Sequence, residues 1–291
     1  MKKLTALALC LLLLAGCASP AVYDGPTKTA WVLSEQTTTS FSPRTGEEWT
    51  DLRTFQYDSF GNVIRSCFYS EGELSSEYRR EYDDRGNMTS TVTWEHGGFL
   101  SYPRSRTDYT FDEQNRPLAT IYRNFLGFEK SRDTYTYDDA ANTVLWEGTY
   151  DTITEWLDEE GNILRSLLHS KVGGVSTVET FYEYDELGRN TRILSYYEDA
   201  LSSTTELVYD DQDRLTQETI FDADGTVISR RTYQYGENTV TTYELGGTRT
   251  VETYRPDGQV ETMEQFNKSG ELTIRTQYTY TQIQVPADRE E

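Results

Sequence analysis

The chain repeats one short motif along most of its length. An aromatic residue, or Leu in one copy, precedes Asp, two variable residues and Gly, and an aliphatic residue follows six positions after the first. The strongest copies are Tyr57-Asp58 with Gly61, Tyr82-Asp83 with Gly86, Leu157-Asp158 with Gly161, and Phe221-Asp222 with Gly225. Three further glycines stand at the same offset, Gly188 after Tyr184-Asp185, Gly258 after Tyr254, and Gly270 after Phe266.

The motif predicts a β-hairpin loop. An Asp side chain opens a type I turn by accepting hydrogen bonds from the backbone that follows, and Gly adopts the positive φ that closes the loop. Asn115 and Asp213 replace Gly in two copies, and both residue types enter the left-handed region at modest cost. Ala141 stands at the offset after Tyr137, so we expect a different turn there.

Weaker turn signals lie between the strong ones, at residues 70–72, 96–98, 172–174 and 245–247. The segments between turns alternate as strands do, and almost none has helical spacing. We therefore predict an all-β fold, a long antiparallel hairpin meander in one coiled or curved sheet of roughly 16 to 20 strands. At about 4.8 Å per strand an open sheet would extend roughly 80 to 90 Å and leave two unpaired edges.

The charge of the chain limits its partners. The formal net charge is −22, and a chain without its first 16 residues keeps 25 basic and 49 acidic residues. Such a surface repels phosphate backbones and anionic headgroups. We expect no nucleic-acid partner.

The first residues predict export. Lys2 and Lys3 precede an apolar stretch that is too short to span a membrane as a helix, and Leu14-Ala15-Gly16-Cys17 follows. This segment resembles a bacterial lipoprotein signal, and the resemblance implies a lipid on Cys17; an ordinary signal peptide or an uncleaved anchor are the alternatives. We expect a signal peptide (1–16), the lipidated Cys and a tether (17–30), a repeat domain (31–285) and a tail (286–291). Cys67 would be the only free thiol, a half-buried strand residue.

The repeated Tyr-Asp-x-x-Gly-Asn or Tyr-Asp-x-x-Gly-Arg motif, seen at Tyr57, Tyr82 and Tyr184, resembles the YD repeats of the Rhs and teneurin proteins. The resemblance covers roughly residues 50–280 and implies a spiralling sheet, which in the large Rhs proteins forms a shell around a toxin. This chain is too short for such a shell, so toxin delivery is not expected. Some YD-repeat proteins have been linked to carbohydrate binding, so the resemblance implies a glycan as one kind of ligand. The turns also resemble those of some immunity proteins, although these are usually cytoplasmic.

Few residues suggest catalysis or metal binding. His96 and His169 are interpreted as surface turn residues, and no phosphate loop or nucleophile motif is present. The Asp-rich loops at 210–213 and 222–225 lack the spacing of a calcium loop, so we expect no metal and no cofactor. Trp94, Trp146 and Trp156 could stack on sugar rings if they are exposed together; otherwise they cover the sheet.

The leading hypothesis is a non-catalytic lipoprotein of the cell envelope, anchored to a membrane outside the cytoplasm, that binds a glycan or a protein. A structural or shielding role, an immunity-type protein and an envelope hydrolase are the alternatives. Exposed clustered aromatic residues would favour the first hypothesis, and a cleft with two close carboxylates would favour the last.

Overall fold

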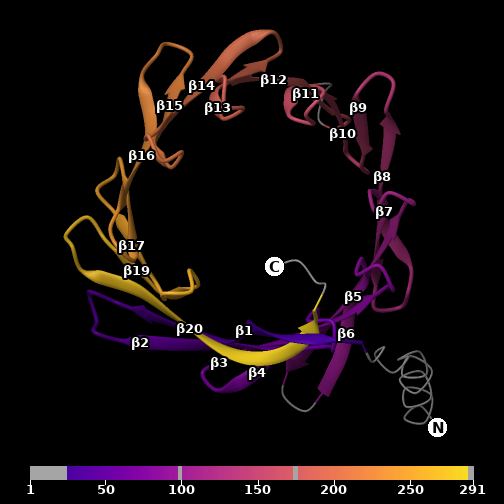
Figure 1. Ribbon diagram of the computed structural model, residues 1–291, viewed down its shortest axis with the longest axis vertical. Coiled ribbons are helices and arrows are strands. Elements are labelled where there is room, and N and C mark those ends of the chain that lie inside the picture. The colour runs from indigo at the N-terminus through magenta and orange to yellow at the C-terminus, as the bar shows by residue number, and fades with distance from the viewer. Residues whose placement is uncertain (1–24, 98–99, 173–175, 288–291) are drawn as a thin grey trace.

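The computed structural model describes residues 25–97, 100–172 and 176–287 (Figure 1). Cys17 and the predicted signal segment lie outside the described residues. The described part of the chain is all-β and forms one antiparallel sheet of 20 strands. Its strands run β1 (Thr27–Phe41), β2 (Glu48–Tyr57), β3 (Val63–Ser70), β4 (Glu73–Tyr82), β5 (Met88–Gly97), β6 (Leu100–Phe111), β7 (Pro117–Asn124), β8 (Glu129–Asp138), β9 (Thr143–Glu147), β10 (Asp151–Leu157), β11 (Ile163–Ser170), β12 (Ser176–Tyr184), β13 (Asn190–Tyr197), β14 (Ala200–Tyr209), β15 (Leu215–Asp222), β16 (Val227–Tyr235), β17 (Thr239–Glu244), β18 (Arg249–Tyr254), β19 (Val260–Phe266) and β20 (Leu272–Pro286).

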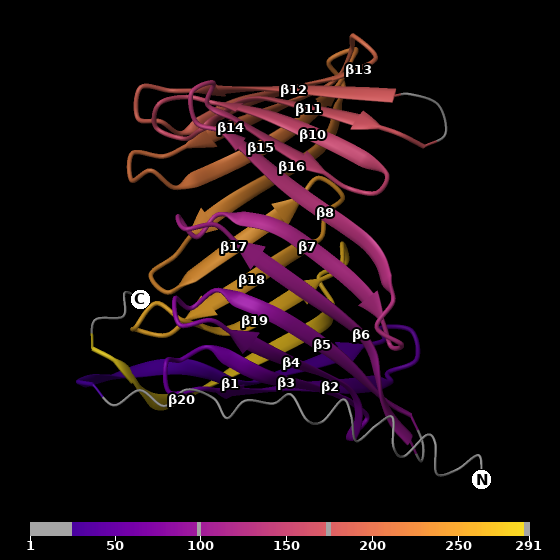
Figure 2. The ribbon, with the colours of Figure 1, turned by 90° about the vertical axis from the view of Figure 1, so that its right-hand side faces the viewer.

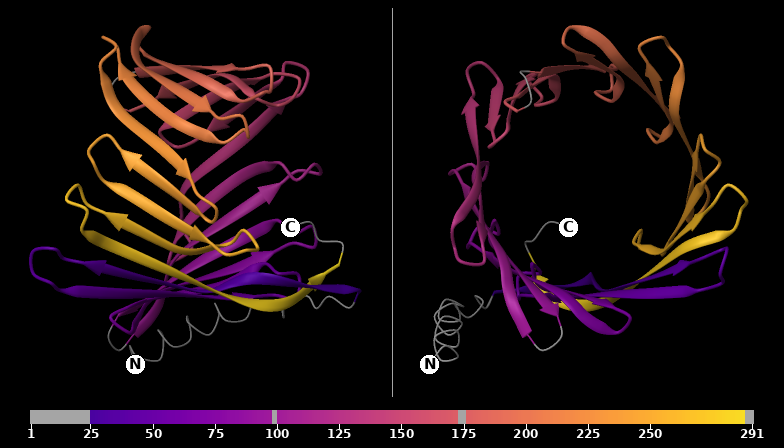
Figure 3. Two further views of the ribbon diagram at one scale, coloured as in Figure 1. Left: turned by 60° about the vertical axis from the view of Figure 1, so that its left-hand side comes forward. Right: turned by 180° about the vertical axis from the view of Figure 1, so that it is seen from behind.

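The sheet closes into a barrel. β1 pairs with β2 through residues 35–41 and with β20 along nearly its whole length, from Thr27 opposite Pro286 to Ser40 opposite Ile274. Figures 1 and 3 show the yellow C-terminal strand lying beside the indigo N-terminal strand. The predicted antiparallel meander is confirmed, but the expectation of an elongated open sheet with two unpaired edges was wrong. Closure gives residues 35–40 of β1 and 274–277 of β20 strand partners on both sides.

The barrel wall is a single layer. Strands cross it at a steep inclination (Figure 2), and 20 strands at about 4.8 Å and 40° of tilt give a circle about 40 Å across. Side chains from opposite walls are too short to fill such a circle. Among the described residues, the buried apolar side chains are few: Cys67, Val285 and Pro286. Neighbouring strands, rather than a central core, therefore supply the packing.

The predicted turns form as expected. The Asp58 carboxylate accepts hydrogen bonds from the backbone N–H groups of Phe60 (2.9 Å) and Asn62 (2.8 Å), and the same pattern repeats in later copies. Gly61 has a φ of 81°, and all seven glycines at this offset have positive φ. Asn115 (62°) and Asp213 (60°) also have positive φ. In the turn after Tyr137, Asn142 has the positive φ (49°) instead of Ala141, so the prediction of a different turn is confirmed.

Strand alternation gives the wall two chemically different faces. Following the register from strand to strand puts the aromatic residues at or near the ends of the even-numbered strands on one face, which we call the tyrosine face; it carries Tyr57, Tyr82, Phe111, Tyr137, Tyr184, Tyr209, Tyr235, Tyr254 and Tyr280. The repeat aromatics Phe221 and Phe266, which lie near the ends of β15 and β19, are on the other face. The other face carries the pairs Arg65–Glu77, Arg123–Asp108, Arg165–Glu179 and Arg275–Glu264, and we call it the ion-pair face.

The two rims of the barrel also differ. Turns that follow even-numbered strands form one rim, the acidic rim, which includes residues 58–62, 83–87, 158–162, 185–189 and 210–214. Turns that follow odd-numbered strands form the opposite rim, the aromatic rim, which includes residues 42–47, 71–72, 125–128, 148–150 and 245–248. The start of β1 and the end of β20 both lie at the acidic rim, where the Ala287 N–H donates to the Pro26 carbonyl (2.9 Å).

Candidate functional site

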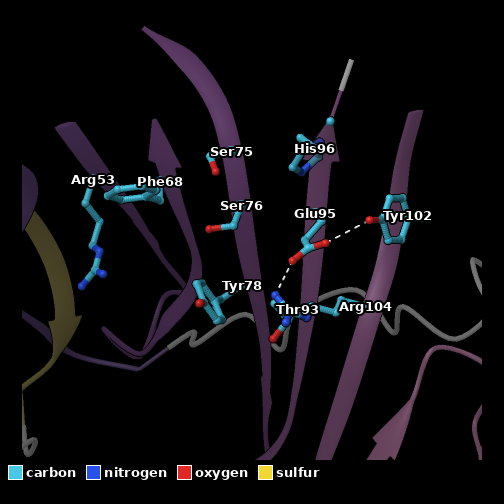
Figure 4. A pocket seen from close by; sticks show the side chains of 11 residues that line it. Arg53, Phe68, Ser75, Ser76, Tyr78, Thr93, Glu95, His96, Tyr102 and Arg104 are labelled. Atoms are coloured by element: carbon cyan, nitrogen blue, oxygen red, sulfur yellow. Dashed lines mark hydrogen bonds and ion pairs between the residues drawn. The ribbon is translucent and has the colours of Figure 1, made fainter. Parts of the chain in front are cut away.

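A cavity of about 510 Å³ lies on the tyrosine face near the aromatic rim (Figure 4). Strands β2 to β6 line it with Arg53, Phe68, Ser75, Ser76, Tyr78, Thr93, Glu95, His96, Gly97, Tyr102 and Arg104. A second cavity of about 210 Å³ adjoins it toward β1 and shares Arg53 and Phe68 with the first. The two cavities together make an elongated depression across six strands.

Two β-bulges shape the larger cavity. The register between β3 and β4 shifts after Phe68, which leaves Ser75 without a cross-strand partner. The register between β5 and β6 shifts after Thr93 and leaves Arg104 as the extra residue. A bulge bends its strand and re-aims the extra side chain. Both extra residues line the cavity, which turns a flat stretch of wall into a concave one.

The cavity combines aromatic rings with charged groups. The Tyr102 hydroxyl donates to the Glu95 carboxylate (2.9 Å), and the Arg104 guanidinium donates to the other oxygen of Glu95. The hydrogen bond to Glu95 and its negative charge raise the pKa of the Tyr102 hydroxyl. Aromatic faces next to planar polar groups suit sugar rings, which present apolar C–H faces and hydroxyl edges.

A buried carboxylate stiffens the wall behind the cavity. Glu77, on the ion-pair face of β4, is 1% exposed and accepts from Arg65 (2.8 Å) and Arg79 (2.5 Å). Burial by itself would raise the pKa of Glu77, but the hydrogen bonds and charges of the two arginines hold it below its usual value. Its chain neighbours Ser76 and Tyr78 line the cavity, so Glu77 helps to position them.

Exposed aromatic side chains gather at the aromatic rim. Large apolar side chains that are at least partly open to solvent there include Trp49, Leu100, Tyr102, Phe125, Leu126, Phe128, Tyr150, Val172, Tyr197, Tyr243 and Leu245. The acidic rim and its adjoining strand ends carry Trp31, Leu118, Leu164, Leu187 and Val208, of which only one is aromatic. The cavity therefore lies at the end of the barrel where exposed aromatic rings concentrate.

The three tryptophans that we predicted as stacking residues do not converge. Trp94 and Trp156 lie on the ion-pair face, on β5 and β10, and Arg79 and Arg165 stack over their rings at 4.7 and 4.3 Å. Trp146 lies on the tyrosine face of β9. None of the three lines either cavity, so the structure does not bring them together as one binding surface.

The predicted turn residues have structural positions. Asp58, Asp83, Asp158 and Asp185, with Gly61, Gly86, Gly161, Gly188 and Gly258, lie in turns of the acidic rim, whereas Asp222, Gly225 and Gly270 lie at the opposite rim. At the acidic rim, successive repeats are joined by the repeat tyrosine. The Tyr209 hydroxyl donates to the Asn190 carbonyl (2.9 Å), and Arg189 of that turn stacks over the Tyr209 ring at 4.9 Å.

The histidines do not occupy surface turns as we expected. His96 lies within β5 with a side chain 16% exposed, its Nδ1 2.7 Å from the Ser101 hydroxyl and its Nε2 3.5 Å from the Glu77 carboxylate. His169 lies within β11, and the predicted strand residue Cys67 is buried in β3. Within residues 25–97, 100–172 and 176–287, no three His, Cys, Asp or Glu side chains are grouped to hold a metal ion.

No helix among the described residues has the length and apolar character needed to cross a membrane.

Sequence reasoning missed the residues that line the cavity. Phe68, Tyr78 and Tyr102 come from three different strands and share no spacing in the sequence. The segments from Leu74 to Ser76 and from Pro103 to Ser105 carry a weak signal of the two β-bulges. Strict alternation of side chains between the two faces is interrupted where a bulge inserts an extra residue.

No protein-family model matches the chain, and no curated protein matches it. Among solved structures, a porin-like protein from Bacteroides uniformis ATCC 8492 is similar, with 12% identity and a TM-score of 0.40 over 88% of this chain and 99% of that one. A porin-like protein from Bacteroides vulgatus ATCC 8482 has 13% identity and a TM-score of 0.25 over 86% and 99%. Both TM-scores are below 0.5, so neither similarity defines the fold of this chain, which follows from its own strand pairing.

Proposed function

We propose that the chain is a non-catalytic envelope lipoprotein with YD-like repeats, which binds a glycan in the cavity at its aromatic rim. The observation that carries this proposal is the cavity itself, which sets Phe68, Tyr78 and Tyr102 beside charged and hydroxyl side chains. Rings supply stacking surface for sugars, and planar polar side chains fix their orientation. Exposed aromatic residues of this rim that lie on the tyrosine face, such as Trp49, would extend this surface beyond the cavity.

The anchor in this proposal is a lipid on Cys17 rather than the barrel wall. A barrel that spans hydrocarbon presents an apolar band on its outer face. Here one face carries the arginine–carboxylate pairs, and the tyrosine face carries mid-strand charges such as Glu155, Glu218 and Arg231. Neither face offers a continuous apolar band, so attachment through the N-terminus is the better physical solution.

Attachment through Cys17 also defines an orientation. The described chain enters the barrel at the acidic rim, and residues 18–26 can extend at most about 30 Å. The acidic rim would then be nearer the membrane. A tilted strand of about 10 residues extends about 25 Å along the barrel axis. The aromatic rim would lie that much farther from the membrane and would be accessible to an external glycan.

Hydrolysis is less favoured by the geometry. Glycoside hydrolases hold two carboxyl groups about 5 to 9.5 Å apart. The carboxylates that line the two cavities, Asp51 on β2 and Glu95 on β5, are separated by three strand spacings, about 14 Å. Glu95 is moreover engaged by Arg104 and Tyr102.

The test is binding of the purified chain that begins at Ala18 to an array of bacterial and host glycans. Every described strand lies between Thr27 and Pro286, so this chain keeps the complete barrel. We expect saturable binding that Tyr78→Ala and Tyr102→Ala each weaken by about 5- to 10-fold, the value of one lost ring contact. Tyr243→Ala, an exposed ring on the ion-pair face of β17, is the matched control and should bind normally. A folded protein that binds no glycan would refute the proposal and favour a structural role.

A further inference from the structure

Arg53 occupies a central place in the candidate site. It projects from the tyrosine face of β2, pairs across the sheet with Gln36 and Phe68, and lines both cavities. Figure 4 shows the Arg53 side chain leaving its strand beside the Phe68 ring, with the guanidinium extending away from that ring. Its side chain is exposed, so a ligand that spans the two cavities would pass over it.

Within the described part of the chain, the other charged side chains of the two cavities have hydrogen-bond or ion-pair partners, and Arg53 has none. The Asp51 carboxylate accepts a hydrogen bond from the Ser70 hydroxyl (2.8 Å), and Glu95 is held by Tyr102 and Arg104. Among the residues that the structure describes, none forms an ion pair or a side-chain hydrogen bond with the Arg53 guanidinium. Among the described residues, Arg53 is therefore the cationic side chain of the site without a carboxylate partner, whereas the Asp51 carboxylate has a neutral hydroxyl partner; the net charge of the chain is −22.

A guanidinium without a protein partner is able to bind one kind of ligand group especially well. Its planar array of N–H donors matches the two oxygens of a carboxylate and binds them through two parallel hydrogen bonds. Phe68 and Tyr78 flank the same depression and offer ring faces to a sugar. Ser75 and Ser76 add hydroxyl groups that suit sugar hydroxyls.

We propose that the cavity recognises an acidic saccharide, a short stretch of hexuronic acid units, and that Arg53 binds the carboxylate of one unit. This inference rests on the proposed glycan-binding function and gives it a ligand class. The acidic surface elsewhere on the barrel disfavours binding of long polyanions by repulsion, so the site selects one or a few carboxylates placed at Arg53.

The experiment is calorimetric titration of the chain that begins at Ala18 with three matched tetrasaccharides: tetragalacturonate, its methyl ester, and the neutral cellotetraose. The methyl ester keeps the size of the acid and removes its charge. We expect the acid to bind about 10- to 100-fold more tightly than the ester, the value of a charge-assisted hydrogen-bonded pair. Arg53→Gln should abolish this preference, and Arg53→Lys should keep only part of it, because an ammonium group lacks the planar fork.

Arg230→Gln is the control for net charge. Arg230 lies on the ion-pair face of β16, remote from both cavities, and its removal changes the net charge by the same amount. Binding of the acid should be unaffected. Equal weakening by Arg53→Gln and Arg230→Gln would overturn the inference, because a general field rather than a contact would then set the affinity.

Two further results separate the inference from the proposed function. Equal binding of the acid and its ester, or equal binding of a sulfated galactan tetrasaccharide, would overturn the carboxylate assignment while glycan binding stands. If the chain that begins at Ala18 is folded, as shown by a cooperative urea transition, and still binds no saccharide, the proposed function is refuted and this inference with it.

Discussion

Replacement of Glu77 by Gln should destabilise the barrel strongly at neutral pH. Glu77 is 1% exposed and is the shared acceptor for Arg65 and Arg79, whose own side chains are 37% and 41% exposed. Gln has nearly the same shape, but its amide group offers one acceptor oxygen and turns N–H donors toward a guanidinium. The substitution thus leaves two arginines competing for one neutral oxygen.

The magnitude follows from the burial of the pair. Removing one partner of a fully buried ion pair costs about 3 to 5 kcal/mol. The two arginines can recover part of this by turning toward water, since more than a third of each side chain is exposed. We therefore expect a loss of about 2 to 3 kcal/mol in the free energy of unfolding at pH 7, measured by urea titration followed by tryptophan fluorescence.

The dependence on pH gives a second, independent check. The pKa of Glu77 is lowered in the folded protein, so its stabilisation is complete above its ordinary unfolded value near 4.5 and is lost as the pH falls through the folded pKa. The difference between the native protein and Glu77→Gln should shrink as the pH falls below about 4. A difference below about 0.5 kcal/mol at pH 7, or one that persists unchanged in acid, would refute this account.

Three further substitutions test the turns, the repeat contacts and the anchor. Gly161→Ala should cost about 1 to 2 kcal/mol in urea unfolding because Gly161 has a φ of 88°, whereas Gly246→Ala, with open space around it and no positive φ, should change stability little. Tyr209→Phe should cost about 1 kcal/mol, since it removes the hydroxyl that donates to the Asn190 carbonyl; an unchanged urea midpoint would contradict this. Cys17→Ser should abolish metabolic labelling with palmitate and release the protein from membranes, and retained labelling would place the lipid elsewhere.

The local structure could be predicted because its determinants are close together in the sequence. An Asp and the backbone groups it caps lie within four residues, so the turn at Asp158 forms from contacts inside one short segment. The same reasoning identified Asn115 and Asp213 as substitutes for Gly and the turn after Tyr137 as different. The antiparallel meander follows directly from a chain of such hairpins.

The candidate site could not be predicted in the same way. Its residues come from six strands, and its concave shape depends on two register shifts that bring Ser75 and Arg104 into the cavity. Tryptophan content suggested a stacking surface, but the register placed Trp94 and Trp156 on the face opposite the cavity. Which face an aromatic residue occupies depends on bulges upstream of it, because a shift of one residue exchanges the two faces.

The sequence by itself determined where the chain turns, which turns need a left-handed residue, and that neighbouring strands pair antiparallel. Only the tertiary structure decided that the sheet closes, that one rim is acidic and the other aromatic, and that an unmatched Arg53 lies between two cavities. The physical reason is the range of the interactions. A turn depends on residues a few positions apart, whereas closure requires Thr27 to meet Pro286, and that meeting is set by the accumulated twist and stagger of all 20 strands.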